Sequence, residues 1–292
     1  MTRNTHAQNS TFASSYTQLY ASAWKRAVFA FSLVDLFRNL IPDNQPIPLV
    51  DGTITYNDGY MISKLIKFRK FPNEYAEAFD LYDKKEYVKS IRYFDDFLNL
   101  NIKDENLYRL NISANMQLKN FERAKILFDT YHENYKLTSD DYSNGGLIYS
   151  RLFLLEESLT FYDQSLKLNP NNCYSLNNKG FTLNTLERYS EAIPLFDKAI
   201  AVDEHFAYSY NNRGLSKIKT GKIEEGLLDI EKSMQLDQNN SYAYRNLGIY
   251  HFDKGEITKA RELFLKSKEL DQETYLIDEL ILSSERGNLT NS

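Results

Sequence analysis

Asparagine recurs every 34 residues in the second half of this 292-residue chain, at Asn144, Asn178, Asn212 and Asn246. An asparagine side chain offers both a carbonyl acceptor and an amide donor, so it can pair with both polar groups of one peptide unit. Four such side chains at a fixed spacing could hold the backbone of an extended chain without reading its sequence. They could equally tie neighbouring helices of this chain together, or remain solvated. In either case the chemistry is that of binding.

The residue types that usually carry catalysis form no recognisable set. The histidines are His6, His132, His205 and His251, and none lies at ligand spacing from another histidine, a cysteine or a carboxylate. The sequence contains no Gly-rich phosphate loop and no nucleophile motif. The single cysteine, Cys173, is interpreted as a small apolar residue, and its isolation excludes an internal disulfide and suits a reducing compartment. The sequence therefore predicts no enzyme activity, no cofactor and no metal.

The 34-residue period also governs the apolar and small residues between positions 71 and 274. A fixed period of this length is typical of a solenoid, in which each unit packs only on its neighbours. We expect a glycine on the first helix of each unit where the second helix approaches closely, and an aromatic side chain that fills the gap between units. The glycines are Gly146, Gly180, Gly214 and Gly248, the small residues are Ser90, Ala124, Ser158, Ala192, Gly226 and Ala260, and the large apolar residues are Phe94, Phe128, Tyr162, Phe196, Ile230 and Phe264.

The pattern resembles the tetratricopeptide repeat, a helix–turn–helix unit, most clearly from Ser241 through Gly248 to Gly255, Ala260 and Phe264. The resemblance implies an all-α fold, a right-handed superhelical solenoid of six helix pairs. The first two units depart from the pattern, because Ala78 and Ile112 stand at the glycine position. The expected units are 71–104, 105–138, 139–172, 173–206, 207–240 and 241–274, followed at 275–292 by a cap helix to Arg286 and a frayed tail, Gly287–Ser292.

The same resemblance places the asparagines on the inner face of the first helices, in a concave groove that would hold a peptide or a segment of a partner protein. The further residues expected to line this groove are the apolar Leu147, Phe181, Leu215 and Ile249, the tyrosines Tyr174, Tyr208 and Tyr242, and the cations Arg151, Lys219 and Arg245.

A two-carboxylate clamp of Lys, Asn and Arg, which similar repeats use to hold the acidic tails of cytosolic chaperones, is not expected. Asp140, Tyr174, Tyr208 and Tyr242 stand where the resemblance calls for lysine. Without those cations the carboxylates of such a tail would be buried unpaired.

The first seventy residues resemble no family that we recognise. Met1–Ser15 is expected to be disordered and Tyr16–Leu40 to form an apolar helix, which leads through a proline-rich connection to a short strand or hairpin within Leu49–Tyr60 and a basic helix at Met61–Lys70. The apolar helix is expected to pack on the first repeat as a cap, with a partner interface or a membrane-surface helix as alternatives.

The net charge of −5 is divided unevenly, with +4 on residues 1–70 and −9 on the remainder. An acidic array argues against nucleic acid as a partner. Neither a membrane span nor a secretory signal is recognisable, so a cytoplasmic location is expected and membrane contact is not. Two functions remain open. One is a non-enzymatic scaffold that binds a partner in the groove. The other is a subunit of a larger immunity, defence or secretion complex, a hetero-complex that it joins through residues 1–70.

Overall fold

The computed structural model describes residues 47–48, 54–55 and 71–290. The disordered start, the apolar helix at 16–40 and the basic helix at 61–70 lie outside the described residues. β1 (Ile47–Pro48) pairs antiparallel with β2 (Ile54–Thr55). β2 lies within Leu49–Tyr60, where a short strand or hairpin was expected, but its partner β1 lies before that range, in the proline-rich connection.

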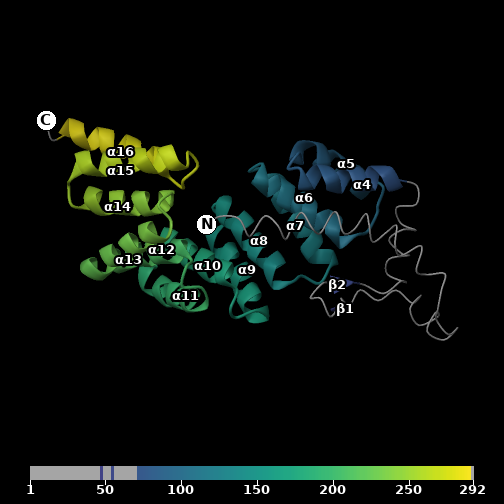
Figure 1. The fold of residues 1–292 in the computed structure, drawn as a ribbon, viewed down its shortest axis with the longest axis horizontal. Helices are drawn as coiled ribbons and strands as arrows, with labels where there is room; N and C mark the ends of the chain where they lie inside the picture. Colours follow the sequence, from purple (N-terminus) through teal and green to yellow (C-terminus); the bar gives the residue numbers. More distant parts are fainter. Residues whose placement is uncertain (1–46, 49–53, 56–70, 291–292) are drawn as a thin grey trace. The chain divides into compact units, whose positions relative to one another are not determined.

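Residues 71–290 are helical and confirm the all-α class of the repeat array (Figure 1). Twelve of the described helices form six consecutive pairs, and a final helix, α16 (Ile277–Thr290), follows them. This helix extends past Arg286, so the expectation of a frayed tail from Gly287 is wrong as far as Thr290. The pairs are α4 (Pro72–Asp83) with α5 (Tyr87–Asn99), α6 (Glu105–Gln117) with α7 (Phe121–Asn134), α8 (Ser139–Arg151) with α9 (Leu155–Leu168), α10 (Cys173–Thr185) with α11 (Tyr189–Val202), α12 (Ala207–Lys219) with α13 (Ile223–Leu236), and α14 (Ser241–Asp253) with α15 (Ile257–Leu270).

The chain divides into two compact units, Met1–Glu133 and Asn134–Ser292. The described part of the first unit has a core around Ala78, Phe94, Phe97 and Leu107. The second unit contains several smaller cores in sequence, each built by adjacent helices, as a stack of repeats requires.

The repeated glycines lie where two helices of one repeat approach closely, as predicted. A Cβ atom at Gly180 would lie 2.6 Å from the ring of Phe196, and one at Gly248 would lie 2.5 Å from the ring of Phe264. Each ring therefore covers the glycine of its own repeat. This corrects the expectation that the aromatic residues mainly fill the gap between units.

The turn inside each repeat contains one residue in the left-handed backbone region. Gly221 has a φ of 88° and Gly255 a φ of 77°. Only these two turns have the residue that adopts this conformation without steric cost. At the same position the four earlier repeats have Lys85, Lys119, Phe153 and Glu187, with φ between 58° and 62°.

Polar pairs sixteen residues apart connect successive repeats. Asn111 Nδ2 donates to Asp95 Oδ1 at 2.8 Å, and Arg213 Nη1 donates to Asp197 Oδ1 at 2.7 Å. In each pair the first helix of one repeat is fixed to the second helix of the repeat before it. Within the described ranges, no helix is long and apolar enough to cross a membrane.

Candidate functional site

The four asparagines of the 34-residue series do not share one environment. Asn144 is exposed and Asn178 is half-buried, whereas Asn212 is 3% exposed and Asn246 is fully buried. Only the first two of the series are therefore open to a bound chain.

The two buried asparagines bond to the first helix of the preceding repeat. Asn212 Nδ2 donates to Asn177 Oδ1 at 3.1 Å, and Asn246 Nδ2 donates to Asn211 Oδ1 at 2.7 Å. A buried amide must find such partners or lose its hydrogen bonds to water without replacement. Asn212 and Asn246 thus hold neighbouring helices together, which is the alternative role that the sequence left open.

Aromatic side chains of the second unit form a continuous series of ring contacts, which we call the ring series. Its members come from α10, α12, α14, the turn after α8, and the segments before α12 and α16. Successive centroids lie 5.5–6.1 Å apart, in the range of favourable aromatic pairs. In order, the members are Tyr174, Phe206, Tyr208, Tyr242, Phe181, Tyr275 and Phe153.

The series includes the three predicted tyrosines and Phe181, and it adds three residues that the sequence analysis did not single out. The other predicted apolar residues are not aromatic and do not belong to the series: Leu215 is buried, and Leu147 and Ile249 are half-buried. Exposure falls along the predicted tyrosines, from 67% at Tyr174 to 41% at Tyr208, and Tyr242 is half-buried.

Phe206 lies at a position where three other first helices have a capping side chain, whereas α4 and α14 have none. The equivalent Asp104, Thr138 and Asn172 each accept a hydrogen bond from a backbone N–H in the first turn of their helix. α12 has no side-chain cap, because phenylalanine has no acceptor. Replacing a cap with an apolar residue typically costs about 1 kcal/mol of stability.

Phe153 breaks a second local rule. It adopts a φ of 61° in the turn after α8, although a bulky residue is disfavoured there, and its side chain is 61% exposed. Leu276 breaks the same rule beside Tyr275, with a φ of 57°. Three locally unfavourable features therefore lie in or beside the ring series: the uncapped helix start at Phe206 and the left-handed conformations of Phe153 and Leu276. Lys85, Lys119 and Glu187 adopt the same left-handed conformation away from the ring series, so only the bulky aromatic side chain of Phe153 is particular to this place.

The three predicted cations differ in their partners. Lys219 Nζ lies 2.5 Å from Asp253 Oδ2. Arg151, at the end of α8, is exposed, and no carboxylate in the described part of the chain forms an ion pair with it. Arg245 is only 7% exposed and lies beneath Tyr275, with its guanidinium carbon 5.8 Å from the centroid of that ring.

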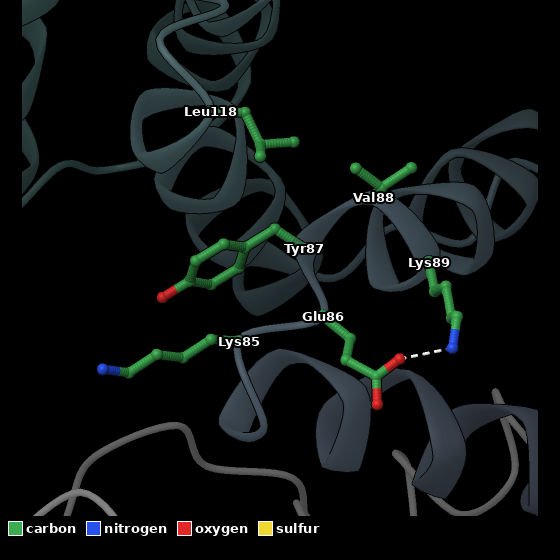
Figure 2. Close-up of a pocket in the computed structure, with 6 residues that line it drawn as sticks. All are labelled: Lys85, Glu86, Tyr87, Val88, Lys89 and Leu118. Carbon is green, nitrogen blue, oxygen red and sulfur yellow. Dashed lines mark hydrogen bonds and ion pairs between the residues drawn. The ribbon is translucent and has the colours of Figure 1, made fainter.

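A shallow cavity of about 240 Å³ in the first unit is a weaker candidate. Figure 2 shows its lining, the turn from Lys85 to Lys89 and Leu118. Its one carboxylate, Glu86, already pairs with Lys89. The remaining surface is largely aliphatic, so the cavity offers neither a nucleophile nor an unsatisfied charge.

Cys173 has the environment expected of a structural residue. Burial raises the pKa of its thiol to about 11, so the thiol stays protonated at neutral pH. His251 is buried, and its Nδ1 lies 2.7 Å from Glu256 Oε2, a contact that the sequence analysis missed. In the described ranges no cluster of three potential metal ligands occurs.

Comparison with protein families matches the second unit to models described as tetratricopeptide repeat, at residues 142–172 and 207–240 with one model and at 161–193 with another. The comparison with curated proteins gave no match.

Solved structures share the fold at low identity. A tetratricopeptide repeat protein from Parabacteroides merdae is 17% identical with a TM-score of 0.52, and the alignment covers 75% of this chain and 99% of that protein. A chain of the APC/C hetero-tetramer Cut9-Hcn1 is 14% identical with a TM-score of 0.58, over 77% of this chain and 45% of that one. These similarities show the fold.

Proposed function

Because the chain is a tetratricopeptide repeat protein, we propose that it is a non-enzymatic scaffold that holds a segment of a partner protein against the ring series of its second unit. Repeats of this family are typically non-catalytic interaction modules. The partner would lie along the first helices, near the accessible Asn144 and Asn178, with Tyr174 and Tyr208 as the exposed end of the surface.

The observation that carries this proposal is that aromatic side chains stand at two positions where the other repeats have polar residues or glycine. Phe206 leaves the start of α12 without a side-chain cap, and Phe153 adopts a left-handed backbone conformation in the turn after α8. Packing alone does not account for these choices, since Phe153 remains mostly exposed. Aromatic side chains of low conformational freedom are the ones that most often dominate protein interfaces.

The test separates binding from folding by restoring the local rules. The double variant Phe153→Gly with Phe206→Asn regains a relaxed turn and a cap, together worth about 2 kcal/mol, and loses ring contacts worth about 0.5–1.5 kcal/mol each. We expect it to melt close to the parent but to lose the partner captured from extract by the immobilised chain. Glu187→Gly, at the same turn position in the next repeat, is the matched control and should retain the partner. A double variant that captures the partner as well as the parent would refute the proposal.

The second function, a subunit docked through residues 1–70, predicts a different result. A chain of residues 71–292 would then lose the partner while the Phe153 and Phe206 variant retained it. Under the proposal made here, the shortened chain keeps the partner.

A further inference from the structure

Arg245 is a buried charge without a countercharge. Its Nη1 donates to Asn246 Oδ1 at 2.8 Å, but its Nε has no hydrogen-bond partner among the described residues. No carboxylate in that part of the chain forms an ion pair with it. Burial lowers the pKa of Arg245, and the groups that oppose this shift are the phenols of Tyr242, Tyr275 and Tyr189. An unpaired buried guanidinium is costly, and it is most readily stabilised by an anion.

Tyr275 covers this guanidinium, and the groups around Tyr275 could also bind a side chain of another protein. Its ring lies 5.5 Å from that of Phe181 and 5.8 Å from that of Phe153. Burial raises the pKa of the Tyr275 phenol, whereas Arg245, a hydrogen bond with Thr185 and Arg151 lower it. Tyr275 therefore places its ring among rings and directly over Arg245, and Arg151 stands two residues before Phe153, whose ring contacts that of Tyr275.

The segment that holds Tyr275 departs from the repeat. The first helices of the second unit begin at Ser139, Cys173, Ala207 and Ser241, each 34 residues after the last, but α16 begins at Ile277, two residues later than this period requires. The delay coincides with the left-handed Leu276, which keeps Tyr275 out of the helix. A strained segment that holds one side chain in place is suited to being displaced.

We propose that Arg245 and Arg151 bind a carboxylate carried beside an aromatic or large apolar group of the partner, and that Tyr275 occupies this site until the ligand displaces it. The proposal rests on the function proposed above and names the chemistry that the surface recognises. The ligand's apolar group replaces the Tyr275 ring against Phe153 and Phe181, and its carboxylate accepts from Arg245 Nε and from the Arg151 guanidinium. The site differs from a two-carboxylate clamp, because the lysine positions of such a clamp remain tyrosines and Asp140.

The carboxylate could come from a chain terminus or from an acidic side chain. Four small probes distinguish these sources: N-acetylphenylalanine and its amide, and the N-acetylated, C-amidated dipeptide Phe-Glu and its Phe-Gln counterpart. Each charged probe is matched by a neutral one of nearly the same shape. Binding is measured by nitrogen-15 NMR titration of the full chain, and shifts at residues 151–153, 181–185, 242–249 and 275 report on the site.

We expect roughly millimolar binding of at least one charged probe, as its size allows, and at least about tenfold weaker binding of its neutral match. Tyr275→Ala should strengthen binding about tenfold, because the site no longer has to open first. Arg245→Met should abolish binding. Arg151→Met changes an exposed residue, leaves the fold intact and should weaken binding of the charged probe. This variant keeps the test decisive if Arg245→Met does not fold. Arg261→Met, which removes a cation already paired with Glu285 and outside the predicted groove, is the matched control and should change nothing.

Equal shifts from charged and neutral probes, binding unchanged by Arg151→Met, or no gain from Tyr275→Ala would each overturn the inference. The proposed function has its own test, and its failure can be distinguished from the failure of this inference. If Phe153→Gly with Phe206→Asn loses the native partner while the charged probes do not bind, the scaffold function stands and the carboxylate site does not.

Discussion

The first two repeats and the last four have different residues where the two helices of a repeat pack against each other. In α8, α10, α12 and α14 a glycine lies beneath a large side chain of the second helix, whereas α4 and α6 have Ala78 and Ile112 at that position, both buried. The partner aromatics Phe94 and Phe128 are nevertheless as buried as Phe196 and Phe264.

This comparison teaches that the glycine sets the distance between helices and is not required for forming the pair. α12 and α13 approach along more of their length than α4 and α5 do. All the members of the ring series, and all the cations near it, belong to the closely packed unit. Close packing within each pair therefore positions the surface to which we assign the function.

The largest effect expected from this comparison is at Gly180. Gly180→Val should reduce the free energy of unfolding by about 3 kcal/mol, because the added atoms would overlap the Phe196 ring, 2.6 Å from a Cβ at this position. Urea unfolding followed by circular dichroism measures the loss. Ala78→Gly in the first unit is the matched control. It should cost only about 1–2 kcal/mol, from lost helix propensity and a methyl-sized void.

A second variant tests the cause. Phe196→Leu combined with Gly180→Val should recover part of the stability, since the smaller side chain makes room for the valine. If Gly180→Val alone is as mild as Ala78→Gly, the close approach of the two helices does not depend on the glycine and the comparison is wrong.

The next effect concerns the ion pairs of the two units. Arg213 makes two hydrogen bonds to Asp229, at 2.8 and 2.7 Å, and one to Asp197, with both Arg213 and Asp229 largely buried. Arg213→Met should cost about 2 kcal/mol, less than a fully buried pair, because Lys217 still lies 2.9 Å from Asp229. In the first unit Arg123 pairs with Asp95 on a more open surface, so Arg123→Met should cost at most about 0.5 kcal/mol.

Thermal melting of both variants checks this difference. Equal shifts of the melting temperature would show that burial does not distinguish the two pairs. A loss at Arg213 that vanishes in high salt would lead to the same conclusion, since a buried pair is screened less than an exposed one.

The sequence was sufficient to predict the features that depend on the 34-residue period. The 34-residue spacing of glycine, small and aromatic residues predicted an all-α array, and the contacts of Gly180 and Gly248 confirm the reason for the glycine. Four members of the ring series were among the residues that the sequence placed in the groove, and their role there stays a prediction: Tyr174, Phe181, Tyr208 and Tyr242.

What the sequence did not predict depends on how repeats stack. Asn212 and Asn246 are buried because each reaches the preceding first helix, and an identical spacing leaves Asn144 exposed. Tyr275 contacts Phe153 only because the second unit brings distant repeats together. A local signal existed in one case. Phe206 stands where Thr138 and Asn172 cap their helices, and a missing cap in a regular series can be read from the sequence alone.

The smallest effect is an acid sensitivity at the end of the array. Glu256 begins the second helix of its repeat, at the position that Glu86 occupies in the first repeat. The hydrogen bond from His251 holds the pKa of Glu256 below its ordinary value of 4.5, with Lys254 adding to the shift. A carboxylate whose pKa is depressed by folding stabilises the native state above that ordinary value, and this stabilisation is lost as the pH falls through the depressed value.

Glu256→Gln removes this contribution, so the parent should melt above the variant at pH 6, and the difference should shrink as the pH falls below 4.5 and disappear once Glu256 is protonated in the native state. The shift should be smaller than that of Arg213→Met, because the Glu256 side chain is exposed to solvent. Glu86→Gln is the matched control in the first unit: Glu86 bonds Lys89 three residues along the same helix and has no buried histidine to hold. It should leave the melting temperature nearly unchanged at both pH values. If the two variants show the same dependence on pH, the contact between His251 and Glu256 does not stabilise the last repeat, and this difference between the two regions disappears.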